Sequence, residues 1–122
     1  MKKSLASQLK KKLDATFSLW VRNRGSKDGY NQCYTCGITK PIKQLQCGHY
    51  VSRTALSTRW DEDNARPQCM PCNVFQHGNM VEYSLLLEQE SPGITKRLRD
   101  KGRQIKKFSI SELKEAIEKY TL

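Results

Sequence analysis

Four cysteines stand in two Cys-x-x-Cys pairs, an arrangement typical of structural zinc sites. The first pair is Cys33-Tyr-Thr-Cys36 and the second is Cys69-Met-Pro-Cys72. The two-residue spacing lets both sulfurs of a pair reach one ion at about 2.3 Å, and two pairs complete a tetrahedron with no open position. The pattern therefore predicts a closed zinc site with these four ligands. We interpret the fifth cysteine, Cys47, as a small buried hydrophobic residue.

A second set of polar residues lies between and just after the two pairs. It comprises His49, Asn64, Asn73 and His77. Because positions i and i+4 share one side of a helix, we expect Asn73 and His77 to face His49 from a helix that begins near Cys72, and to bind a divalent ion. His49 would remove a proton from a water aimed at a phosphate. Asn64 would hold the loop that fixes the histidine strand, since an amide both donates and accepts.

Each of these residues also has a structural interpretation. Asn73 fits a helix cap, and His77 fits the C-terminal end of a helix, where the helix dipole favours it. The acidic run Asp61–Asp63 reads first as a solvated turn and second as a source of one metal ligand.

The formal net charge of +10 is concentrated in two blocks. Residues 1–28 and residues 94–107 each carry +6, whereas residues 29–93 carry −1. Basic blocks on either side of a nearly neutral centre indicate a partner rich in phosphate, with the chemistry between them. No signal peptide and no apolar membrane span is recognisable, so we expect an intracellular chain whose paired thiols bind metal.

Hydrophobic spacing and turn residues outline the elements that must position these groups. In chain order they are a basic amphipathic helix over residues 4–22, a first strand Gln44–Val51, a second strand near Thr58–Trp60, a loop Asp61–Pro67, a helix from near Cys72 to Gly78, a helix capped by Asn79 and ending at Glu90, a basic helix from Ser91-Pro92 to Gly102, and a last helix that follows the capping box Ser109–Glu112.

Taken together, the motifs resemble the HNH, or ββα-metal, endonucleases, and among these the NinG (Rap) family of phage recombination proteins. The motifs are Cys33-x-x-Cys36-Gly37, Gly48-His49-Tyr50, Asp61-Glu62-Asp63-Asn64, Gln68-Cys69-x-Pro-Cys72-Asn73 and Gly78-Asn79. The resemblance implies a structure-selective endonuclease with a Mg2+ or Mn2+ cofactor that cuts Holliday junctions and D-loops in the cytoplasm of a phage-infected bacterium. It makes His49 the general base, Asn64 the central Asn, and Asn73 the metal-binding helix residue. The sequence departs from many HNH enzymes at Gly48, where they have a metal-binding Asp, and at Asn73, where they have His.

We therefore predict one α+β domain with a small ββα-metal core. Residues 1–28 form a basic helix, residues 29–90 the zinc-stabilised core, and residues 91–122 a basic helical extension. The expected phosphate contacts are Lys10, Lys11, Lys12, Arg97, Arg99, Lys101 and Lys106. Because resolving a branch needs two nicks, a symmetric homodimer joined through the N-terminal helix fits this function, as do contacts with recombination proteins. The alternative is a zinc-ribbon adaptor that binds nucleic acid without catalysis.

Overall fold

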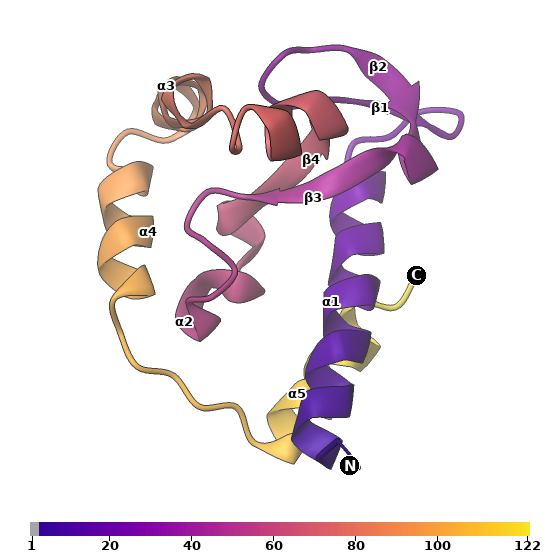
Figure 1. Ribbon diagram of the computed structural model, residues 1–122, viewed down its shortest axis with the longest axis vertical. Helices are drawn as coiled ribbons and strands as arrows, with labels where there is room; N and C mark the ends of the chain where they lie inside the picture. Colours follow the sequence, from indigo (N-terminus) through magenta and orange to yellow (C-terminus); the bar gives the residue numbers. More distant parts are fainter. Residues whose placement is uncertain (1–2) are drawn as a thin grey trace.

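Two short antiparallel hairpins lie among five α-helices in the computed structural model, which describes residues 3–122 (Figure 1). The fold is thus mixed, with helices and strands together. The helices are α1 (Leu5–Asn23), α2 (Leu56–Arg59), α3 (Met80–Glu90), α4 (Ile94–Gly102) and α5 (Ile110–Tyr120). The strands are β1 (Tyr30–Gln32), β2 (Thr39–Pro41), β3 (Leu45–His49) and β4 (Ala65–Cys69), and the short turns are η1 (Ile42–Gln44), η2 (Glu62–Asn64) and η3 (Pro71–Phe75). Met1 and Lys2, which begin the predicted basic segment, lie outside the described residues.

The central hairpin joins β3 to β4 and differs from the predicted one. Its register runs from the pair Leu45–Cys69 to the pair His49–Ala65. The second strand therefore lies in the segment predicted as a loop, whereas residues 58–60 lie in and just after α2. The sequence suggests a loop at Pro67 because proline is rare in central strands. A two-stranded sheet tolerates it, since one edge of each strand needs no N–H donor.

The first cysteine pair lies in the turn of a hairpin that the sequence pattern did not predict. Strands β1 and β2 pair antiparallel, and the Cys33 N–H donates to the Ile38 carbonyl across the turn at 2.8 Å. Gly37 adopts a positive φ of 79°, which a glycine reaches without strain. The hairpin thereby presents Cys33 and Cys36 on one tight loop.

The segment after the second cysteine pair is shorter than predicted. A single turn of π-helix, η3, ends at Phe75, and the next helix begins only at Met80. His77, Gly78 and Asn79 all have positive φ values of 51°, 90° and 51°. The prediction that His77 shares a helix with Asn73 is therefore wrong, because the chain has already reversed through left-handed backbone. Asn79 does stand before α3, but its side chain makes no capping hydrogen bond.

The N-terminal helix packs its apolar face inside the protein. Leu13, Phe17 and Val21 are buried against β4 and α5, and the Phe17 and Tyr120 rings meet edge-on at 4.9 Å. The capping box that starts α5 at Ser109 is confirmed. Since this apolar face is occupied by the chain's own α5, it is not free to serve as the predicted dimer interface.

The basic helix α4 lies on the other side of the central hairpin from α1 (Figure 1). It begins at Ile94, not at Pro92, and Gly93 precedes it with a φ of 92°. The carboxylate of Glu88 accepts hydrogen bonds from the Gly93 and Thr95 N–H groups and so caps the helix from outside. Among residues 3–122, no helix combines the length and the apolar character needed to cross a bilayer.

Candidate metal centre and adjoining pocket

The four paired cysteines converge as predicted. Their sulfur atoms all lie within 4.8 Å of one another, and Cys36 Sγ is 3.7 Å from Cys69 Sγ. A zinc ion with four Zn–S bonds of about 2.3 Å requires sulfur separations of roughly 3.8 Å, so the donor set fits such an ion. Because four thiolates at this distance repel one another, a cation is needed to ionise all of them.

Hydrogen bonds favour the ionised form of one thiol of the cluster, Cys33. Burial raises the pKa of Cys33, but the Thr35 hydroxyl and nearby backbone N–H groups outweigh it and lower that pKa to about 6. Burial and the neighbouring thiols raise the pKa of Cys69 to about 12. Asn79 adds an N–H donor 3.8 Å from Cys72 Sγ. The two pKa values shift in opposite directions because the thiols lie so close together that ionising one opposes ionising the next.

Gln68 connects the cluster to the histidine strand. Its side chain is fully buried, and Nε2 donates to the Thr35 hydroxyl at 3.0 Å and to the Gly78 carbonyl at 2.9 Å. Its Oε1 has no hydrogen-bond partner among the described residues, and a Cβ built on Gly48 would lie 2.0 Å from it. Gln68 therefore occupies the space that a side chain at position 48 would need. This explains why glycine stands at position 48.

Beside the cluster, an open pocket of about 740 Å³ lies along β3. Three segments distant in sequence line it: the middle of α1, strand β3 with the residues that follow it, and the left-handed turn between η3 and α3. The predicted residues His49, Asn73 and His77 all lie in its wall. The fold thus brings together three of the four residues singled out from the sequence.

His49 is held in one defined tautomer. Its Nε2 lies 2.9 Å from the Arg59 carbonyl oxygen, which only accepts, so Nε2 carries the proton and Nδ1 carries the lone pair. Burial lowers the pKa of His49, and the positive charges of Arg53 and Arg59 lower it further. The imidazole is therefore neutral at pH 7 and has one nitrogen ready to accept a proton.

Asp14 of α1 is the acidic residue that sequence reasoning missed. Its carboxylate accepts hydrogen bonds from Arg53 at 2.9 Å, from the Trp60 indole at 3.0 Å, and from Arg59 through two nitrogens. Asp14 thereby anchors the residue whose carbonyl holds His49. No local motif marks Asp14, because it lies 35 positions before His49 in the chain.

Asn64 lies behind the pocket rather than in it. The side chain is completely buried, accepts from the Val51 N–H at 2.8 Å, and donates to the carbonyls of Val51 and Thr58 at 3.0 and 3.1 Å. These bonds close the chain between β3 and β4 into a fixed loop, as the sequence suggested for this amide. Asn64 thus acts on the histidine strand through the backbone.

Asn73 and His77 face the pocket from different kinds of backbone. The Asn73 amide nitrogen donates to Gln46 Oε1 at 2.7 Å, which directs Asn73 toward β3. His77 is exposed on the left-handed turn. Both offer atoms that bind divalent ions, an amide oxygen and an imidazole nitrogen, and neither carries a negative charge.

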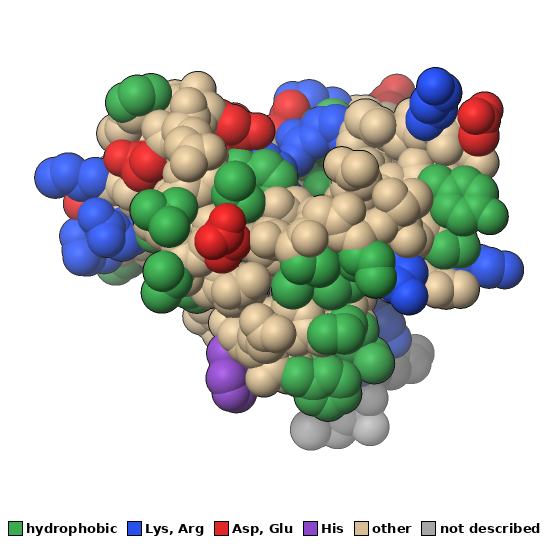
Figure 2. All heavy atoms as spheres, turned by 90° about the horizontal axis from the view of Figure 1, so that it is seen from above, with side chains coloured by type: hydrophobic (Ala, Val, Ile, Leu, Met, Phe, Trp, Pro, Cys, Tyr) green, Lys and Arg blue, Asp and Glu red, His purple; other side chains and the backbone are tan. Residues whose placement is uncertain are grey.

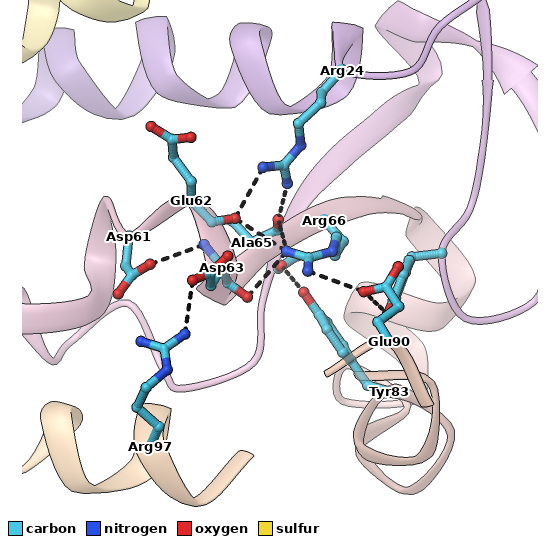
Figure 3. A network of polar contacts seen from close by, with 11 residues as sticks. Arg24, Asp61, Glu62, Asp63, Ala65, Arg66, Tyr83, Glu90 and Arg97 are labelled. Carbon is cyan, nitrogen blue, oxygen red and sulfur yellow. Dashed lines mark hydrogen bonds and ion pairs between the residues drawn. The ribbon is translucent and has the colours of Figure 1, made fainter. Parts of the chain in front are cut away.

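Two arginines fix the short turn that contains Asn64, as Figure 3 shows. Arg24 donates to the carbonyls of Glu62, at 3.0 Å, and of Ala65. Arg66 donates to the carbonyls of Glu62 and Asp63 at 3.1 and 3.0 Å. The carbonyl groups of this irregular turn lack backbone N–H donors, and the two guanidinium groups supply the missing hydrogen bonds. Arg24 and Arg66 therefore have a structural role.

The predicted phosphate contacts fall into two groups. Three are engaged in ion pairs of 2.7 to 3.0 Å: Arg97 with Asp63 (Figure 3), Lys101 with Asp61, and Lys106 with Glu112. Lys11, Lys12 and Arg99 are exposed, and Lys10 is half-buried. Asp61 and Asp63 thus contact α4, and no residue of the run Asp61–Asp63 lines the pocket. The acidic run is therefore not placed to supply a ligand to a metal ion in the pocket.

Hydrophobic side chains also reach the surface near the metal cluster. Met70, Val74 and Phe75 around η3, and Val81 and Leu85 on α3, are between 46% and 78% exposed. Figure 2 shows hydrophobic groups gathered on the face seen from above, with most lysines and arginines toward its margin. On this face, hydrophobic side chains therefore form the centre and basic side chains lie mostly around it.

Comparisons with known proteins agree with these motifs. A family model described as "Bacteriophage Lambda NinG protein" matches residues 2–122. The chain is similar to Protein ninG of Salmonella phage P22, 39% identical over 56 residues, and to Protein ninG of Escherichia phage lambda, 38% identical over 56 residues. Each match covers 45% of this chain but spans only 27% of the relative's length. No solved structure matches the chain at a significant level.

Proposed function

The chain belongs to the NinG family, and from this premise we propose that it is a metal-dependent DNA endonuclease of the ββα-metal class. Its substrates in this proposal are branched recombination intermediates, Holliday junctions and D-loops, in the host cytoplasm. The observation that carries the proposal is His49, held as the Nε2–H tautomer in an open pocket beside potential metal ligands.

In the proposed reaction, His49 Nδ1 accepts a proton from the water that attacks the phosphodiester. The Arg59 carbonyl fixes the ring, and Asp14 holds Arg59 in turn. A histidine whose pKa is lowered stays unprotonated at neutral pH, which a general base requires. The positive charge formed on the ring would be stabilised by Asp14.

Asn73 and His77 would hold the divalent ion. The amide oxygen of Asn73 is a ligand that Mg2+ and Mn2+ both accept, whereas the imidazole of His77 suits Mn2+ better than the harder Mg2+. Gln68 fills the place of the additional carboxylate found in many HNH enzymes. When bound there, such an ion offsets charge on the phosphoryl oxygens and on the leaving 3′ oxygen. A pocket with only neutral ligands leaves several positions of the ion to water and to the substrate phosphate.

The zinc-type cluster has a structural role in this proposal. It joins the β1–β2 turn to the end of β4, and Gln68 passes that rigidity to β3. The basic residues of α1 and α4, and Lys106 after α4, would bind the DNA backbone. Of these, Arg97 and Lys106 form exposed ion pairs, whereas Lys101 pairs with Asp61, whose side chain is 9% exposed. Exposed ion pairs contribute about 1 kcal/mol or less, so phosphates can replace the carboxylates.

The second candidate is a zinc-stabilised adaptor that binds nucleic acid without cutting it. It is favoured by the closed cysteine cluster and by the absence, among residues 3–122, of a free carboxylate in the pocket wall: the one carboxylate there, Asp14, is already bound by two arginines and a tryptophan.

Cleavage of defined substrates separates the candidates. The purified chain would be incubated with Mg2+ or Mn2+ and a labelled four-way junction, a linear duplex of the same sequence, or RNA. The endonuclease proposal predicts metal-dependent nicks near the branch and little cutting of the other two. Tight, salt-sensitive binding without nicks supports the adaptor, and equal cutting of linear DNA contradicts selectivity for branches.

A further inference from the structure

Arg22 is a cation without a counter-ion in the wall of the pocket. It lies on α1, and its Nε donates to the Ser18 carbonyl and hydroxyl at 3.2 and 3.1 Å, while Nη1 donates to the Ile42 carbonyl at 3.3 Å. All three acceptors are neutral. No carboxylate of residues 3–122 forms an ion pair with it.

The other charged groups around the pocket do not supply that counter-ion. Asp14, the one carboxylate in its wall, is already bound by Arg53, Arg59 and the Trp60 indole. Arg53 lines the same pocket and is 61% exposed, so a second guanidinium faces the opening. His49 is neutral, and the pocket wall therefore carries a net positive charge.

Comparison with Arg24 shows that this arrangement is specific. Arg24, two residues later, uses both terminal nitrogens on the carbonyls of the η2 turn, so its donors are used up inside the protein. Arg22, which lines the pocket, is fixed at Nε and Nη1, and its Nη2 has no hydrogen-bond partner among the described residues. A guanidinium held rigid by neutral acceptors, with free donors, is prepared for an anion with paired oxygens, such as a phosphodiester.

The same flank of α1 continues away from the pocket. Lys11, Ser18 and Arg22 are separated by seven and four residues, so they lie along one side of the helix. Lys11 and Arg22 are roughly 16 Å apart along the axis at 1.5 Å per residue, enough to follow several phosphates of one strand.

We propose that this flank of α1 binds the backbone of the DNA strand that enters the pocket, with Arg22 gripping a phosphate beside the one that is cut. The assignment deepens the proposed endonuclease function and rests on it for the identity of the anion. It adds Arg22 and Arg53 to the basic residues that sequence reasoning selected, and it makes α1 part of the site.

The test is equilibrium binding of a fluorescent four-way junction without added divalent ions, across a series of KCl concentrations. Arg22→Gln should weaken binding about tenfold at 0.1 M salt and lower the slope of log affinity against log salt by about one. The matched control is Lys114→Gln, which removes one positive charge from an exposed position of α5 outside the pocket and should change affinity by less than about twofold. Equal effects of the two variants would overturn the assignment.

Arg22→Lys keeps the charge and guards against misfolding of the glutamine variant. It should retain the salt slope of the wild type but bind about threefold more weakly, because the planar fork is lost. If Arg22→Lys binds the junction with wild-type affinity and nicks it at the wild-type single-turnover rate, the gripping role of Arg22 is excluded. Thermal melting of each variant confirms that the fold is intact.

The outcome is separable from that of the proposed function. If Arg22→Gln loses junction binding but the wild type never nicks DNA with Mg2+ or Mn2+, the phosphate site stands and the endonuclease proposal fails. If the wild type nicks junctions while Arg22→Gln binds and nicks as well as Lys114→Gln, the endonuclease stands and the phosphate site fails.

Discussion

The cysteine cluster and the pocket beside His49 lie along one hairpin, yet they are built in opposite ways. The cluster gathers four sulfurs within 4.8 Å from two short loops and leaves no position open. The pocket is open, about 740 Å³ in volume, and takes its walls from α1, β3 and the turn after η3. A closed site suits a metal that holds structure, whereas an open site with neutral ligands suits a metal that must also meet substrate.

One buried side chain joins the two regions. Gln68 bonds the cluster's Thr35 and the pocket's Gly78, and it fills the space above Gly48 on the histidine strand. The rigidity of the cluster is thereby passed to the strand that positions His49. Damage to the cluster should therefore disable the pocket, whereas damage to the pocket's polar residues should leave the cluster intact.

The largest effect is expected from removing a zinc ligand. Cys69→Ser should abolish zinc binding and cooperative folding, because a structural zinc contributes about 10 kcal/mol or more and small domains have only about 5–15 kcal/mol of stability. Elemental analysis should find one zinc per wild-type chain and none in the variant. Cys47→Ala is the control, since Cys47 is outside the cluster; loss of zinc in this variant would contradict the assigned ligands.

A smaller loss of stability is expected at Asn64. Replacement by alanine leaves the half-buried N–H and carbonyl of Val51 without the Asn64 amide, removes one of the bonds to the buried Thr58 carbonyl, and empties a fully buried position, which should together cost about 3 kcal/mol. Asn73→Ala removes one half-buried hydrogen bond and should cost about 1 kcal/mol or less. Urea unfolding measures both free energies, and equal costs would show that Asn64 is not the structural anchor described.

The contact between Gly48 and Gln68 can be tested with a double-mutant cycle. Gly48→Ala should destabilise by about 2 kcal/mol, because its Cβ would meet Gln68 Oε1 at 2.0 Å. Gln68→Ala makes room for that methyl group, so the double variant should be more stable than the sum of the two single losses predicts. Strict additivity would mean that the two residues do not collide.

The smallest effect concerns the pH dependence of His49. Its pKa is lowered from 6.5 in the folded protein, so the unfolded chain binds more protons between the two values. Stability contributed by neutral His49 is therefore complete above pH 6.5 and is lost as pH falls through the folded pKa, with a slope of at most about 1.4 kcal/mol per pH unit. Urea unfolding at several pH values measures the slope, which His49→Ala should reduce; an unchanged slope would contradict the lowered pKa.

How well each region could be predicted depends on how local its determinants are. The cluster could be predicted from the spacing of its four cysteines, Cys33, Cys36, Cys69 and Cys72. Likewise, α1 could be predicted from its hydrophobic periodicity and the start of α5 from its capping box. The second hairpin strand was misplaced because Pro67 reads as a loop residue, although an edge strand tolerates it.

The lining of the pocket could not be predicted in full, because it depends on long-range contacts that no local sequence pattern reveals. Asp14 and Arg22 reach it from α1 only because Phe17 and its neighbours pack that helix against α5 and β4. His77 reaches the pocket through left-handed backbone, so the predicted helical geometry was wrong although His77 does line the pocket. Long-range packing, rather than motif spacing, decides what surrounds His49.

Single-turnover nicking of a four-way junction by the wild type and by His49→Ala tests the central claim most directly. Both proteins would be zinc-loaded, shown to be folded, and assayed with Mn2+ at pH 7.5 under saturating protein. The account predicts equal junction binding and a nicking rate at least about a hundredfold lower in the variant, the usual contribution of a general base. Nicking at the wild-type rate by folded His49→Ala would contradict the assignment of the pocket as the catalytic site.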